Sequence, residues 1–205
     1  MQVAAHVGAE QAGVEEETKV KLCCTQRVGI IVLLSLVSIP LHEMGHYIVY
    51  KCANIPVHVT FQSVHPVMPI SGLVAVLGLA GGPAFSLSAA LACLLIATQR
   101  PGFFWITAAF TNATLRLFPC TMDLLHAIYG KMPFSDEGEI ARGLTHSSFA
   151  RFLVVLCFFA AAATLTVLAG RQYRFNKHAS LKAFGIYLLS LGTGICVLIV
   201  DELLH

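Results

Sequence analysis

The sequence predicts an all-α polytopic membrane protein with about five transmembrane helices and a short β-strand or hairpin segment after the first of them. The chain of 205 residues is 57% hydrophobic and only 12% charged, with a mean hydropathy of +0.76, unlike an ordinary soluble domain. Several apolar blocks reach the length of about 20 residues that a helix needs to cross a bilayer. The net charge of +2 is nearly balanced, which argues against nucleic acid as a partner.

The apolar blocks divide the chain into a polar N-terminal tail at 1–27 and a membrane-embedded domain at 28–205. The tail carries most of its charge in an acidic run followed by basic residues, and it begins with no apolar segment of the kind found in signal peptides. Polar punctuation between the blocks sets the limits of five predicted spans. These run from Val28 to about Tyr50, from about Ile70 to Thr98, from Gly102 to about Pro119 with an extension to Ile128 left open, from Phe149 to Gly170, and from about Ala179 to Leu204.

Three segments are expected to depart from simple spanning helices. Gly81, Gly82 and Pro83 should bend or break the second span, because proline removes a backbone donor and glycine adds backbone freedom. The stretch 54–70 combines alternating β-branched residues with three prolines, which predicts a short strand or hairpin near the membrane interface. The segment 131–148 reads as a polar loop with a helix that starts after Ser135, a residue suited to the N-cap position.

The first predicted span contains the motif HExxH, formed by His42, Glu43 and His46. Helical residues four apart lie on one face, so both imidazoles can reach one metal ion. A catalytic zinc site needs two such ligands, a third protein ligand and an open position for water, beside which a glutamate takes the water's proton. We therefore interpret His42 and His46 as ligands of one Zn²⁺ per chain and Glu43 as the catalytic base.

The membrane setting strengthens this interpretation. Short HExxH matches also occur by chance on surface helices that bind no metal. Here the motif starts about 22 Å along the helix from Arg27, at 1.5 Å per residue, which places it inside the hydrocarbon region. Histidine and glutamate at that depth are costly and usually mark a functional site.

Three stretches of the sequence resemble the site-2 protease family of intramembrane zinc metalloproteases. "HEMGHYIVYK" is similar to the family's metal-binding motif in a spanning helix, "LAGGPAFSL" (79–87) to its Gly-Pro helix interruption, and "FSDEGEIARGL" (134–144) to its later aspartate motif. The resemblance covers about half of the chain. It implies an integral, multi-pass membrane enzyme that lies in the lipid bilayer, binds zinc and cleaves peptide bonds in or near the transmembrane segments of a protein substrate.

The third metal ligand has three candidates. Asp136 is favoured because it begins the pattern Asp-x-Gly-x-Ile-x-Arg, which is similar to the family's aspartate motif. Asp123 is the alternative, since it follows Pro119 by four residues and so better preserves the family's spacing between proline and aspartate, although it lacks the following glycine. His126, one helical turn after Asp123, is a third option, but a lone histidine on an apolar face is more often a hydrogen-bonded core residue.

Asn112 and Arg116 lie one helical turn apart in the third predicted span. Donors at this spacing could stabilise the oxyanion that develops when a peptide carbonyl is attacked. Polar contact between helices, or an arginine that reaches toward the interface, would explain the same two residues equally well.

Two other functions compete with proteolysis. A non-catalytic member of the same fold would bind transmembrane partners without cleaving them. An ion or metal transporter would also place histidine and glutamate inside the membrane, but it would need charged partners along several spans. In the proteolytic interpretation, the extended segment from Val57 to Gln62 could pair edge to edge with an unwound substrate.

Overall fold

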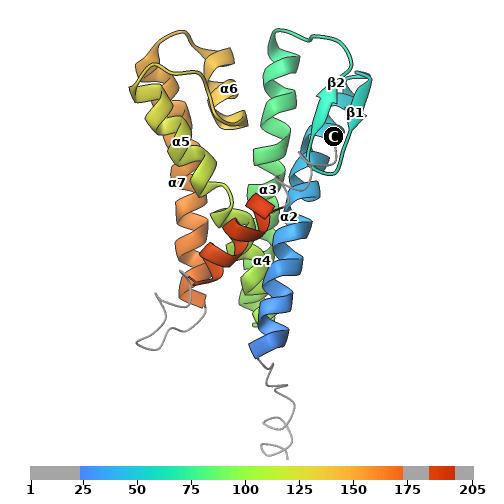
Figure 1. Cartoon of the computed structure of the whole chain (residues 1–205), viewed down its shortest axis with the longest axis vertical. Coiled ribbons are helices and arrows are strands. Elements are labelled where there is room, and N and C mark those ends of the chain that lie inside the picture. Colours follow the sequence, from blue (N-terminus) through green and yellow to red (C-terminus); the bar gives the residue numbers. More distant parts are fainter. Residues whose placement is uncertain (1–23, 173–184, 197–205) are drawn as a thin grey trace, which may run out of the picture.

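The computed structural model describes residues 24–172 and 185–196, and most of them are helical (Figure 1). In chain order the elements are α2 (Cys24–Cys52), β1 (Val57–Val59), β2 (Val64–Pro66), α3 (Leu73–Gln99), α4 (Phe103–Thr114), α5 (Leu117–Ile128), α6 (Asp136–Leu144), α7 (Ser148–Gln172) and a further helix at Gly185–Cys196. Residues 1–23 of the predicted polar tail and the two ends of the fifth predicted span lie outside the described residues, whereas residues 24–27 of the tail form the start of α2.

The helices form two arms that meet at α4. In one arm α2 packs along α3 and carries the β1–β2 hairpin, and in the other α5 packs along α7. Helix α4 contacts α2, α3 and α7, whereas α6 contacts α3, α5 and α7. Figure 1 shows the two arms diverging from α4 toward the end of the molecule where α6 and the hairpin lie.

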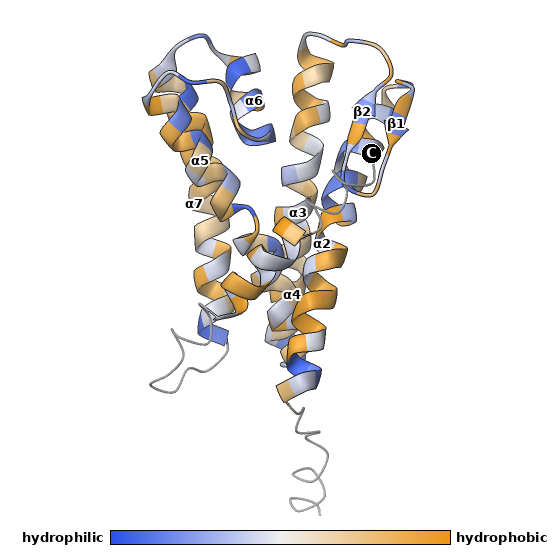
Figure 2. Cartoon of the chain, in the orientation of Figure 1, coloured by the Kyte–Doolittle hydropathy of each residue, from blue (hydrophilic) through white to orange (hydrophobic). Residues whose placement is uncertain are grey.

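Three of the described helices, α2, α3 and α7, are long and apolar enough to cross a membrane. They match the first, second and fourth predicted spans, and they are consistent with a membrane protein. Figure 2 shows apolar residues along these long helices and polar residues gathered on α6. The described part of the fifth predicted span forms an apolar helix of the shorter class, Gly185–Cys196.

The third predicted span is not one helix, so this part of the prediction is wrong. The segment forms two helices of 12 residues each, α4 and α5, which are separated at Leu115 and Arg116. The physical reason is Pro119, which has no N–H to donate to the Leu115 carbonyl four residues earlier and whose ring crowds that carbonyl. The break places Arg116 at the junction of the two arms.

The expected break in the second span is also wrong, since α3 continues from Leu73 to Gln99 through Gly81, Gly82 and Pro83. All three residues are buried. A proline inside an apolar helix is tolerated where neighbouring helices cover the freed carbonyl group. These residues serve close packing against α2, as the site described below shows.

The predicted hairpin is present. β1 and β2 are antiparallel, with Val57 opposite Pro66, His58 opposite His65 and Val59 opposite Val64. The N–H of Thr60 donates to Ser63 at 2.9 Å and closes the turn. Both strands contact α2, so the hairpin lies against the helix that carries the HExxH motif.

Candidate metal centre

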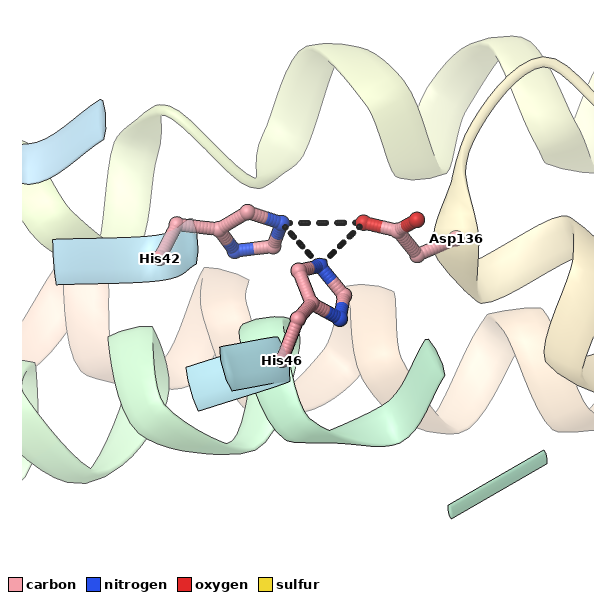
Figure 3. Close-up of side chains that lie close together, drawn as sticks. All are labelled: His42, His46 and Asp136. Carbon is pink, nitrogen blue, oxygen red and sulfur yellow. Dashed lines mark hydrogen bonds and ion pairs between the residues drawn. The ribbon is translucent and has the colours of Figure 1, made fainter. Parts of the chain in front are cut away.

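The side chains of His42, His46 and Asp136 converge on one point, two from α2 and one from the first residue of α6 (Figure 3). His42 Nε2 lies 2.9 Å from Asp136 Oδ2 and 3.2 Å from His46 Nε2, and His46 Nε2 lies 3.3 Å from Asp136 Oδ2. Ligand atoms about 2.0 to 2.1 Å from a tetrahedral zinc ion lie about 3.3 Å from one another. The three atoms therefore form one face of such a site, and the cluster could hold a metal ion.

The second nitrogen of each imidazole is held by α3. His46 Nδ1 donates to the carbonyl oxygen of Gly78 at 2.8 Å, and His42 Nδ1 lies 3.1 Å from Ser86 Oγ. Because a carbonyl oxygen only accepts, Nδ1 of a neutral His46 carries the proton and Nε2 presents its lone pair to the centre. Such outer contacts orient the ligand rings and set their tautomer.

Glycines on both helices make room for the two imidazoles. A Cβ on Gly82 would overlap the ring of His46 and would lie 2.6 Å from His42 Nε2. Gly45 of α2 and Gly81 of α3 each face the other's backbone, so that a side chain on either would overlap a carbonyl group. The close crossing of α2 and α3 at these glycines brings Gly78 and Ser86 within reach of the ligands.

The carboxylate of Asp136 is partly covered, with 28% of its side chain exposed. Burial by itself would raise its pKa, but the close contacts of its carboxylate with the His42 and His46 imidazoles outweigh burial and hold the pKa well below its usual range. The oxygen that faces the imidazoles is therefore ionised, as a metal ligand must be.

Neither of the other two candidates for the third ligand reaches the histidine pair. The Asp123 carboxylate accepts hydrogen bonds from the loop before α6, including one from the N–H of Phe134 at 2.6 Å, and from the N–H of Gly138 at 3.0 Å. His126 Nδ1 donates to the Met132 carbonyl at 2.6 Å on the exposed side of α5. Among the residues that the structure describes, Asp136 is the acidic group that joins the two imidazoles.

Arg116 reaches the centre from the α4–α5 junction. Its Nη1 lies 3.4 Å from His42 Nε2 and 3.5 Å from the buried carboxylate of Glu137. Asn112 is also buried, and its Nδ2 donates to the Ala108 carbonyl at 2.9 Å, while its Oδ1 has no hydrogen-bond partner among the described residues. As placed here, Arg116 offers a donor near the site and Asn112 offers an acceptor.

Two cavities open beside the cluster, and Glu43, Gln62 and Asp136 line both of them. The first, of about 400 Å³, lies between the arms. Its wall also includes His42, Asn112 and Arg116, together with apolar side chains from α2, α5 and the helix Gly185–Cys196. The second, of about 380 Å³, lies under the hairpin. It is lined by His46, Tyr50 and residues 62–66, so Glu43 lies where the two cavities meet.

On the hairpin side, the second cavity is lined by Gln62, the last residue of the segment Val57–Gln62 that was expected to pair with a substrate, and by residues 63–66, mainly β2. β1 lies on the other side of β2 and pairs with it.

Comparison with family models, with curated proteins and with solved structures finds no match for this chain. The support for the candidate site is therefore the geometry of its own residues. Ser86, Gly78 and Glu137, which support the cluster, were missed by sequence reasoning. Ser86 lies within the Gly-Pro stretch 79–87 and Gly78 directly before it, but nothing in that stretch marks either residue as a partner of the histidines. The signal that could have found Glu137 is its position beside Asp136 at the start of a short polar helix.

Proposed function

We propose that this protein is an intramembrane zinc metalloendopeptidase of the site-2 protease type, which cleaves peptide bonds in or near transmembrane segments. The observation that carries the proposal is the convergence of His42 and His46, from a helix apolar enough to span a membrane, with Asp136 at the start of α6, while Glu43 lines the same cavities. Two imidazoles and one carboxylate are the donor set of many zinc hydrolases.

A zinc ion bound by these three groups would lower the pKa of a water molecule to about 7 and polarise the carbonyl to be attacked. The protein supplies the base for that water. Glu43 follows His42 in α2 and lies at the junction of the two cavities, where its carboxylate can take the water's proton and later give it to the leaving amine.

Arg116 and Asn112 have complementary tasks in this proposal. The Arg116 guanidinium can donate to the developing oxyanion, and it must then leave His42 Nε2, which is needed as a ligand, while keeping its contact with Glu137. The Oδ1 of Asn112 is buried and has no partner among the described residues, so it could accept a hydrogen bond from a substrate N–H only when substrate entry uncovers it. This revises the expected oxyanion role of Asn112, because its donor nitrogen is engaged within α4.

A helical substrate must be unwound before its carbonyl can be attacked, since its backbone groups are satisfied within the helix. The hydrogen bonds Thr60 N–H to Ser63 and Val67 N–H to Pro56 flank the strands, which makes the His58–His65 pair the one that exchanges ladder bonds. The N–H and C=O of Val64 therefore point away from β1, on the cavity side of β2. The Val64 backbone already makes a hydrogen bond to Glu43, so an extended substrate segment that paired with this edge would displace that contact.

The test is zinc content and cleavage of a model membrane substrate by the full chain, with Glu43→Gln as the variant. The proposal requires zinc to be retained and cleavage to fall by several orders of magnitude, because the ligands stay and the base is lost. Glu139→Gln is the matched control, since that glutamate is on the exposed side of α6 in an ion pair with Arg142, and it should change neither quantity.

The competing functions give different results. A non-catalytic binding protein would hold zinc and show no cleavage in the unaltered chain. A transporter would move a metal ion across vesicle membranes in a Glu43-dependent manner and would leave the substrate intact. Either result would overturn the proposal.

A further inference from the structure

Both oxygens of the Asp123 carboxylate accept hydrogen bonds, although this residue lies outside the metal cluster. The side chain is buried, with 2% exposed. Its Oδ1 accepts from the N–H groups of Phe134 at 2.6 Å and Ser135 at 3.2 Å. Its Oδ2 accepts from the Gly138 N–H at 3.0 Å and from the Ser135 hydroxyl.

These donors belong to the start of α6, where the first N–H groups of a helix lack partners within the helix. Ser135 occupies the N-cap position with extended backbone, at φ −140° and ψ 179°, but its side chain makes no capping hydrogen bond. Gly138 is the third residue of α6, whose N–H an N-cap side chain normally binds. Asp123 makes this bond instead, so a side chain of α5 caps α6.

The cap determines where Asp136 lies, because Asp136 is the first residue of α6. Gly138 permits the contact, since a Cβ there would overlap the Asp123 carboxylate. Ser135 Oγ also lies 2.7 Å from Glu137 Oε2, and Glu137 Oε1 lies 3.5 Å from Arg116. The start of α6 is thus held at two places, by Asp123 of α5 and by Arg116 at the α4–α5 junction.

We infer that Asp123 is a positioning residue for the third metal ligand: by capping α6 from α5, it holds the Asp136 carboxylate against the two imidazoles before any ion binds. This role rests on the metal site of the proposed function. It adds that Asp123, the alternative third ligand in the sequence, does not bind the ion itself but positions Asp136 through the backbone of residues 134–138.

The experiment uses the full chain in detergent or nanodiscs, with Co²⁺ as the probe because its visible spectrum reports the ligand set. Asp123→Ala is compared with Asp136→Asn, with the milder Asp123→Asn, which keeps one acceptor oxygen, and with Thr121→Ala on the exposed side of α5. A double variant, Asp123→Ala with Ser135→Asn, supplies a longer capping side chain at the N-cap position, where the Ser135 hydroxyl is held by Glu137 and makes no capping bond. Amide hydrogen exchange at 134–138 is measured on the metal-free proteins.

Loss of the cap should weaken Co²⁺ binding about 10- to 100-fold, the usual effect of removing a group behind a ligand, and should remove the exchange protection of the amides of Ser135 and Gly138. The double variant should recover affinity and the parent spectrum, and Asp123→Asn should lie in between. Thr121→Ala should match the parent protein.

Two results would overturn the inference. Asp123→Ala could bind Co²⁺ as the parent does with unchanged amide protection, or it could lose binding as completely as Asp136→Asn with no recovery in the double variant. If the parent protein binds no Co²⁺, the proposed function fails, while the exchange measurements on the metal-free proteins still decide whether Asp123 caps α6.

Discussion

Substitution of Gly82 by alanine should remove the metal site while leaving the fold in place. The added Cβ would lie 2.6 Å from both Cε1 and Nε2 of His42 and would overlap the ring of His46. Non-bonded carbon contacts are comfortable at about 3.5 to 4.0 Å, so the His42 ring must move by about 0.9 Å and the His46 ring, which lies closer to the added Cβ, by more. Metal–ligand distances tolerate only about 0.2 Å.

The displacement is therefore several times the tolerance of the site, and we expect Gly82→Ala to weaken zinc binding by about 100-fold or more, the order of effect that a 1 Å misplacement produces. The fold should survive, because one extra methyl group in a packed interior costs about 1 to 3 kcal/mol, and alanine recovers about 1 kcal/mol of that through its higher helix propensity.

The assay is zinc affinity by chelator competition, together with thermal unfolding of the metal-free protein. Gly29→Ala is the matched control, since a Cβ at that position of α2 meets nothing within 4 Å, and zinc affinity should be unchanged. Parent-like zinc affinity in Gly82→Ala would refute the close contact between α3 and the two imidazoles.

Three further predictions concern the same centre. Asp136→Asn should reduce zinc content to near zero in protein that still folds, because the amide cannot supply the ionised oxygen that faces His42 and His46, and a full complement of zinc by elemental analysis would contradict this. Ser86→Ala should lower zinc affinity about 10-fold, through loss of the contact to His42 Nδ1; the same chelator competition measures it, and an unchanged value would mean that packing alone orients the ring. Zinc at 100 times its dissociation constant should stabilise the folded state by about 2.7 kcal/mol, seen as a rise in Tm that Asp136→Asn abolishes, and a Tm that ignores zinc would count against a site built in the native state.

Much of the fold follows from short patterns along the chain. The apolar runs within α2, α3 and α7 predict helices of spanning length because the bilayer requires about 20 such residues. Alternating β-branched residues between prolines predict the hairpin at 57–66 for an equally local reason. The errors concern proline, whose effect on a helix depends on its surroundings. Pro119 is the third residue of α5, just after the break from α4, whereas Pro83 lies within a continuous helix that neighbouring elements cover.

The two histidines and the glutamate of the candidate site could be predicted from the sequence, because their spacing matches the helical repeat and polar side chains deep in an apolar run are costly. The third candidate ligand could not be predicted in the same way. Asp123 and Asp136 are 13 residues apart, and both fit part of one motif. Their roles separate only when α6 folds back onto α5, so that one carboxylate faces the imidazoles and the other faces backbone N–H groups.

By itself, the sequence determined the helix-spaced pair of His42 and His46, the glutamate beside His42 and the apolar setting in which such side chains are costly, because these depend on residues within one helix. Only the tertiary structure decided that Asp136 completes the cluster, that Ser86 and Gly78 hold the rings and that Gly82 leaves room for them. Those contacts join residues 32 to 94 positions apart along the chain, and no local pattern encodes which distant groups a packed interior will bring together.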